Sequence, residues 1–138
     1  DLDGNPVPVG TVAQNTRLVV VLDVTEQSSW PSRVLVVDML PAGFEIDNPN
    51  LVSSANLAAF AWLPDDVNPA HVEFRDDRFV AAFTEDNNTE RAYKLAYVVR
   101  AVSPGGFVHP PAYVEDMYRP YLNARGESGR LEILGARP

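Results

Sequence analysis

Two histidines, His71 and His109, are the first residues to consider for chemistry, because a nucleophilic triad needs a base beside its nucleophile. Each lies in a short run with the character of a β-strand, and His109 precedes two prolines, which favour extended backbone. Strand histidines of this kind are usually half-exposed polar positions, and no G-x-S-x-G sequence accompanies them. We therefore expect no catalytic residues and no enzymatic activity.

Adjacent acids and one glycine pair are the remaining candidates for chemistry. Asp65-Asp66 and Asp76-Asp77 lack the spaced oxygen ligands of an EF-hand loop. Gly105-Gly106 lies between strands, whereas a phosphate site needs clustered glycines at a strand-to-helix turn. Glycoside hydrolysis needs two converging carboxylates, and nothing in the sequence selects a pair among 19 acids. We expect neither a metal site nor a cofactor.

Residues 110–121 group tyrosine, methionine and arginine among prolines, which predicts a loop rather than an ordinary central strand. Two interpretations stay open on chemistry alone. In one, Tyr113 anchors the loop in the core, with Met117 and Tyr118 as plugs. In the other, the loop is a contact surface, since tyrosine, methionine and arginine are enriched at protein–protein interfaces. The candidate interface residues are Tyr113, Glu115, Met117, Tyr118, Arg119 and Tyr121.

The elements that must position these residues are short β-strands. Residues 17–24 and 33–40 are apolar on both faces, as in strands covered from both sides. Residues 92–102 place Tyr93, Leu95, Tyr97 and Val99 on one face, with the period of two that a strand requires. The further predicted strands are residues 44–46, 71–74, 79–83, 107–113 and 131–134.

Turn signals separate these strands. Leu40-Pro41-Ala42-Gly43 predicts a type I turn, with proline second and glycine fourth. The remaining segments are a polar hairpin turn at 75–78, turns at 85–90 and 104–106, an inlet or short edge strand within 1–16, and one or two helical turns or an irregular loop at 53–63. Short strands between turns, without long helices, indicate an antiparallel β-sandwich.

Composition limits the classes of function. The 138 residues suit one domain, and no apolar run approaches the roughly 20 residues that span a bilayer. The net charge of −8 argues against binding to nucleic acid or to an anionic membrane surface. The chain has no cysteine, which excludes a disulfide framework and a thioester of its own. Because it opens on Asp1, we expect a domain excised from a longer protein.

Several segments together resemble the C-terminal macroglobulin-like domain of bacterial alpha-2-macroglobulins. They are V-D-M-L-P-A-G-F-E-I at 37–46, N-P-N-L at 48–51, H-V-E-F-R-D-D-R-F-V-A-A-F at 71–83, Y-V-V-R-A-V-S-P-G at 97–105 and P-P-A-Y-V-E-D-M-Y-R-P at 110–120. The resemblance runs in order from about residue 17 to the end. V-E-D-M-Y-R-P close to a C-terminus is its most specific element.

The resemblance implies a large periplasmic protein, in many members an inner-membrane lipoprotein, that traps proteases after they cut a bait region. The last domain of such proteins packs beside the thioester domain, and an apolar loop helps to exclude water from the thioester. That implies a shielding role for the loop holding Met117 and Tyr118. Their opposite charges separately predict that Glu115 and Arg119 pair across its rim. The expected partners are the other domains of the same chain, and proteases for the whole protein. The alternative is a free-standing Ig-like binding or adhesion module.

Overall fold

The computed structural model describes residues 1–8, 10–26, 31–47, 71–85 and 92–136. Within this part of the chain there is no helix, and no element that could cross a membrane as a long apolar helix. The predicted helical turns at 53–63, the acids at 65–66 and most of the turn at 85–90 lie outside the described residues. The strands are β1 (Thr11–Ala13), β2 (Arg17–Thr25), β3 (Ser32–Met39), β4 (Phe44–Ile46), β5 (His71–Phe74), β6 (Arg78–Glu85), β7 (Ala92–Ala101), β8 (Gly105–His109), β9 (Tyr113–Asp116), β10 (Arg119–Arg125) and β11 (Gly129–Leu134).

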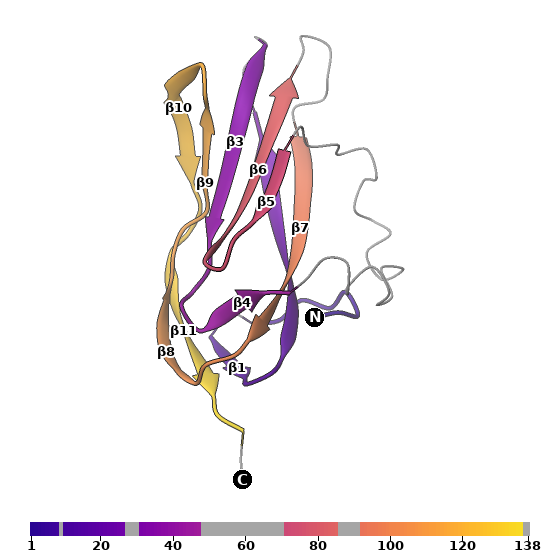
Figure 1. The fold of residues 1–138 in the computed structure, drawn as a ribbon, viewed down its shortest axis with the longest axis vertical. Coiled ribbons are helices and arrows are strands. Elements are labelled where there is room, and N and C mark those ends of the chain that lie inside the picture. The colour runs from indigo at the N-terminus through magenta and orange to yellow at the C-terminus, as the bar shows by residue number, and fades with distance from the viewer. Residues whose placement is uncertain (9, 27–30, 48–70, 86–91, 137–138) are drawn as a thin grey trace.

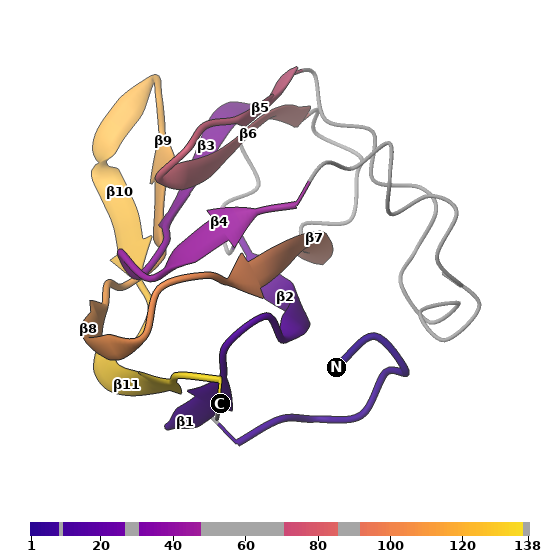
Figure 2. The same ribbon diagram turned by 60° about the horizontal axis from the view of Figure 1, so that its bottom comes forward.

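These strands form three sheets, and the predicted β-sandwich is confirmed (Figure 1). A five-stranded antiparallel sheet has the order β10-β9-β3-β6-β5 and lies across from an antiparallel sheet of order β2-β7-β4 (Figure 2). A small third sheet, β1-β11-β8, lies beside these two layers. It departs from the antiparallel pattern, because β1 pairs parallel with β11.

The core forms where the inward rows of the strands meet. Along β7 the predicted alternation is confirmed for Leu95, Tyr97 and Val99, which are all buried. The ring of Tyr97 stacks on that of Phe79 from the opposite sheet, with centroids 4.6 Å apart. This aromatic contact joins the two layers, and Val34, Val36, Ala81, Phe83 and Ile133 pack into the same cluster.

Strand β2 differs from its prediction in one respect. It was expected to be covered on both faces, yet residues 17–22 are only half-buried. The reason is its place at the edge of the sheet, where β7 is its one paired neighbour among the described strands. Burial alternates along β3, an interior strand. Val34 and Val36 are buried, whereas Leu35 and Val37, on the other face, are half-buried.

The turn before β4 lies one residue later than predicted. The N–H of Phe44 donates to the carbonyl oxygen of Pro41 at 3.0 Å, so the turn runs from Pro41 to Phe44 rather than from Leu40 to Gly43. A packing constraint selects glycine at position 43. A Cβ there would lie 2.4 Å from Cε2 of Phe107 and 2.6 Å from Cδ1 of Ile133.

We expect Gly43→Ala to lower the free energy of unfolding by about 1–3 kcal/mol, the usual cost of an extra methyl in a packed interior. The added carbon must displace the Phe107 ring and the buried Ile133, which hold β8 and β11 against the turn. Urea unfolding measures the effect. Gly106→Ala is the matched control, because a Cβ at Gly106 meets nothing within 4 Å. An equal loss in both variants would show that the tight contact at position 43 is not the cause.

The region after β7 also differs from its prediction. Gly105 and Gly106 belong to strand β8, opposite Ile133 and Glu132 of β11, and not to a turn. The strand expected at 107–113 divides at Pro110, since proline has no N–H for a continuing ladder. Its first part becomes β8 of the small sheet, and its last residue opens β9 of the five-stranded sheet.

Candidate functional site

The segment that was expected to be a loop is a β-hairpin of strands β9 and β10. Strand β9 pairs with β3 on one side and with β10 on the other, so it is an interior strand of its sheet. The prediction of a loop at 110–121 is therefore wrong. The prolines stand at 110, 111 and 120 and leave the four residues of β9 free to pair with both neighbours.

Asp116 organises the tip of this hairpin, and the sequence analysis did not select it. Its side chain is 5% exposed. Oδ1 accepts a hydrogen bond from the backbone N–H of Tyr118 at 3.0 Å, and Oδ2 accepts one from Nε of Arg119 at 2.7 Å. The predicted rim pairing of Arg119 with Glu115 is thus wrong, because Arg119 reaches the buried carboxylate of Asp116 instead.

The electrostatics of Asp116 follow from these contacts. Burial by itself raises the pKa of a carboxyl. Here the hydrogen bond from Tyr118 and the guanidinium of Arg119 outweigh burial, so the pKa of Asp116 lies below its ordinary value. The N–H of Met117 donates to the carbonyl oxygen of Arg33 at 2.7 Å, which ties the tip to the start of β3. The turn is therefore fixed by an ionised carboxylate and by a backbone contact to a neighbouring strand.

A bulge follows the tip on β10. Arg119 stands opposite Asp116, and the next register partner, Glu115, stands opposite Asn123. Residues 120–122 therefore bulge out of the ladder, as expected where Pro120 offers no N–H on an edge strand. Nδ2 of Asn123 donates to the carbonyl oxygen of Pro120 at 3.0 Å and closes the bulge.

The tip and the bulge carry exposed apolar side chains. Met117 is 44% exposed, Tyr118 68% and Tyr121 77%. The interpretation of Met117 and Tyr118 as core plugs is therefore wrong for this chain. Leu122, which the sequence analysis did not select, is 40% exposed. We call Met117, Tyr118, Tyr121 and Leu122 the hairpin patch.

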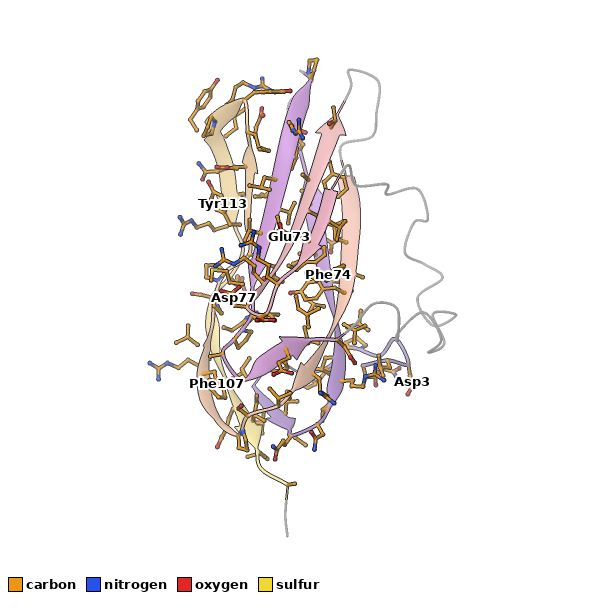
Figure 3. The ribbon with its side chains drawn as sticks, in the orientation of Figure 1. Asp3, Glu73, Phe74, Asp77, Phe107 and Tyr113 are labelled. Carbon is orange, nitrogen blue, oxygen red and sulfur yellow. The ribbon has the colours of Figure 1, made fainter. Side chains whose placement is uncertain are left out.

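The other two candidates, Tyr113 and Glu115, lie together on the same face of β9. Tyr113 is half-buried, and its hydroxyl donates to Oε2 of Glu115 at 2.8 Å. That hydrogen bond is the main reason that the pKa of Tyr113 lies above its ordinary value. The guanidinium of Arg125 lies 5.3 Å from the centre of the Tyr113 ring. Tyr113 is labelled on the hairpin well below its tip (Figure 3), so the structure separates Tyr113 from Met117 and Tyr118 at the tip.

A hollow of about 380 Å³ adjoins the hairpin. It lies between the end of β2, at residues 24–26, and the hairpin, with Val34 and Val114 among its lining residues. Tyr121 and Leu122 stand at the same hollow. The hairpin patch is therefore continuous with a concave surface, a shape that a projecting side chain of another protein surface can enter.

The remaining sequence candidates lie on several separate elements where the structure describes them. At the predicted hairpin turn, Arg78 donates a hydrogen bond of 3.0 Å to each Oδ atom of Asp77, and the neighbouring Asp76 is exposed. His109 lies on β8, and the side chain of His71 is outside what the structure describes. Among the side chains that the structure describes, no group of three or more histidines and acids is placed to hold a metal ion.

Comparison with known sequences connects this chain to one family. The profile of the bacterial alpha-2-macroglobulin MG10 domain matches residues 1–120, which includes the first 16 residues that the sequence resemblance left out. An alpha-2-macroglobulin of Xylella fastidiosa is 39% identical over 99% of this chain. The chain covers only 9% of that relative's length.

Solved structures give the same relation. The alpha-2-macroglobulin of Escherichia coli activated by porcine elastase matches 96% of this chain at 35% identity and a TM-score of 0.82, over 12% of its own chain. The native conformation of the Escherichia coli protein matches 99% of this chain at 33% identity and a TM-score of 0.80, over 9% of its own chain. The fold is therefore similar in a native and in a protease-activated form of that relative.

Proposed function

The chain belongs to the bacterial alpha-2-macroglobulin MG10 domain family, and from that premise we propose that it is a non-enzymatic structural and interaction domain of a periplasmic protease-trapping inhibitor. In this proposal the domain packs against the neighbouring thioester-type domain of the same polypeptide. The whole protein traps proteases, and this domain contributes contacts rather than catalysis. The parent is held in the periplasm, as a lipoprotein of the inner membrane.

The hairpin patch carries the proposal. Four large apolar side chains are exposed within six residues, on a tip that Asp116 and Arg33 hold in one conformation. Aromatic and methionine side chains on a rigid support are typical of the central contacts of an interface, because little conformational entropy is lost when they are covered. The carboxylate of Asp116, at the tip, is already paired with Arg119, so docking would not bury an unpaired charge there.

Shielding of a reactive bond is the chemical role proposed for this contact. A thioester survives only where water and stray nucleophiles are kept away, and close-packed apolar side chains exclude both. Methionine suits such a contact because its unbranched side chain fills irregular gaps. The candidate interface residues therefore divide into two groups. Met117, Tyr118 and Tyr121 contact the partner domain, and Glu115, Tyr113 and Arg119 support the hairpin.

The similarity to both forms of the Escherichia coli protein supports a role as one preserved unit. If this domain behaves as that relative does, its sandwich persists through protease activation. The free-standing adhesion module has no observation in its favour, since relatives match the chain over nearly its whole length as part of a longer protein.

Replacing Met117 or Tyr118 with Asp tests the contact. In the 138-residue chain we expect each change to alter the free energy of unfolding by no more than about 0.5 kcal/mol, because both side chains are exposed. In a thioester-bearing full-length protein, we expect the reaction with methylamine to become about tenfold faster, equivalent to losing about 1.4 kcal/mol from a central interface contact. Thermal unfolding measures the first effect, and single-turnover reaction with methylamine the second.

Val108→Asp is the matched control, because Val108 is 59% exposed on β8 of another sheet. It should change neither quantity. Collapse of the unfolding transition in the Met117 or Tyr118 variant would make these residues part of the core. An unchanged methylamine rate in both variants would count against shielding, even if the domain were intact.

A further inference from the structure

A second concave site lies away from the hairpin patch and has no part in the function proposed above. It is a cavity of about 390 Å³ at the edge strand β2, bounded by the start of the chain, the end of β3 and strands β7, β8 and β11. This volume is in the range of pockets that hold small molecules. Its wall is mostly apolar, with Leu18, Val20, Leu40, Phe44, Val99 and Leu131 among the lining residues.

Five polar residues line this cavity. Asp1 and Asn5 are hydrogen-bonded to each other, and the other three are Asp38, Tyr97 and His109. Asp38 is 5% exposed, and Tyr97 is equally well buried. The Tyr97 hydroxyl donates to Oδ2 of Asp38, and His109 is close enough to act electrostatically on the same carboxyl. Among the described residues, no Lys or Arg pairs with Asp38. Within the described part of the chain, this buried carboxylate thus has one neutral donor and no Lys or Arg partner.

We propose that this cavity is a binding site for a small primary ammonium on an apolar body, with Asp38 as its anionic anchor. The ammonium replaces the missing cation of Asp38, and a charged pair excluded from water is far stronger than an exposed one. The apolar part of the ligand contacts Leu18, Val20 and Phe44, which line the cavity. Tyr97 keeps the carboxylate oriented through its hydroxyl.

A neutral or anionic ligand should bind this cavity more weakly than a cation. An anion would approach a buried carboxylate in a chain that already carries a net charge of −8. A neutral alcohol can donate one hydrogen bond to Asp38, yet it leaves the carboxylate charge uncompensated. The preference for a cation therefore rests on Asp38, and the preference for an apolar body rests on the walls.

Hexylammonium is the probe, titrated into the isotope-labelled 138-residue chain at pH 8, where an imidazole carries little positive charge. We expect saturable shifts of backbone amide signals confined to the cavity, at Leu18, Val20, Phe44 and His109. Hexanol, the neutral isostere, should bind about 10- to 100-fold more weakly, the difference made by a hydrogen bond to a charged group. Nα-acetyl-lysine amide, which keeps the side-chain ammonium, should also bind more weakly than hexylammonium, because its polar backbone groups cannot enter the apolar cavity.

Asp38→Asn should weaken hexylammonium binding by the same factor of about 10 to 100, since Asn keeps the acceptor for Tyr97 and removes the charge. Asp76→Asn, at the exposed turn, removes the same charge from the surface and should leave binding unchanged. Equal affinity for hexanol, unchanged binding in Asp38→Asn or shifts outside the cavity would each overturn the proposal. Equal affinity for the lysine amide would also overturn it, by making a protein side chain the occupant. If Asp38→Asn does not fold, the comparison of hexylammonium with hexanol still decides.

Discussion

Replacing Phe44 with Ala is expected to lower the free energy of unfolding by about 3–5 kcal/mol, the usual cost of removing a buried aromatic ring. Phe44 is 7% exposed and belongs to the main core cluster. It opens β4, a strand of three residues that pairs with β7 from Phe44 to Ile46. Truncation to Ala leaves a cavity and removes the packing that holds this short strand in place. We do not expect the surrounding side chains to fill that cavity, so the lost stability is not recovered.

Urea unfolding of the 138-residue chain measures this effect, with Tyr118→Ala as the control. Tyr118 is also aromatic but is 68% exposed, and its truncation should change the free energy of unfolding by no more than about 0.5 kcal/mol. A loss near zero in Phe44→Ala would place that ring at the surface. The register of β4 against β7 would then be wrong.

Local pattern was enough to predict most of the strands. The β-branched runs at 17–24 and 33–40 and the alternation through Leu95, Tyr97 and Val99 became β2, β3 and β7, because burial of one row and strand propensity favour the same structure there. The hairpin at 75–78 was predicted for a similar reason, since a polar turn lies between two apolar runs. The N–H of Arg75 donates to the carbonyl oxygen of Arg78 at 2.9 Å across it.

Pairing between distant segments could not be predicted from local pattern. Strand β9 has only four residues between prolines, and its central position depends on β3, about 80 residues earlier in the chain. The edge position of β2 depends on which sheet β2 joins, and its apolar residues alone do not reveal it. The sequence resemblance identified the tip residues Met117 and Tyr118, whereas opposite charge alone predicted the wrong partner for Arg119. The sequence places two acids, Glu115 and Asp116, within reach of that arginine. Successive side chains of β9 point to opposite faces of the sheet, and Asp116 is the one on the buried face.

Replacing Asp116 with Asn is expected to cost about 1.5–3 kcal/mol at neutral pH, the contribution of hydrogen bonds to a buried charged group. Asn can still accept from the N–H of Tyr118, but its amide cannot replace the charge that Arg119 contacts at 2.7 Å. Besides the lower free energy of unfolding, we expect the tip of the hairpin itself to open more often. Faster hydrogen exchange at Met117 and Tyr118 would show that the tip has lost its fixed conformation.

The pH dependence of this cost has a definite sign. The pKa of Asp116 is lowered in the folded chain, so its contribution is fully present above the pKa of an unfolded aspartate, near 3.9. It is lost as the pH falls from there through the lower folded value. The difference between the wild type and Asp116→Asn should therefore be largest at neutral pH and shrink toward pH 2. A difference that stays constant over that range would show that the carboxylate charge is not what stabilises the tip.

Asp38→Asn should behave in the opposite way. Burial is the largest cause of its shift and outweighs the hydrogen bond from Tyr97 and the nearby His109, so the pKa of Asp38 is raised in the folded chain. The wild type then loses stability as the pH rises from below about 3.9 through the folded value, because a buried charge forms without a full partner. The variant avoids this loss and should be at least as stable as the wild type at pH 7. The two aspartates are equally buried, and the directions of their pKa shifts rest on opposite balances between burial and charge pairing. If the change in the free energy of unfolding varied with pH in the same direction for both Asn variants, at least one of these two directions would be wrong.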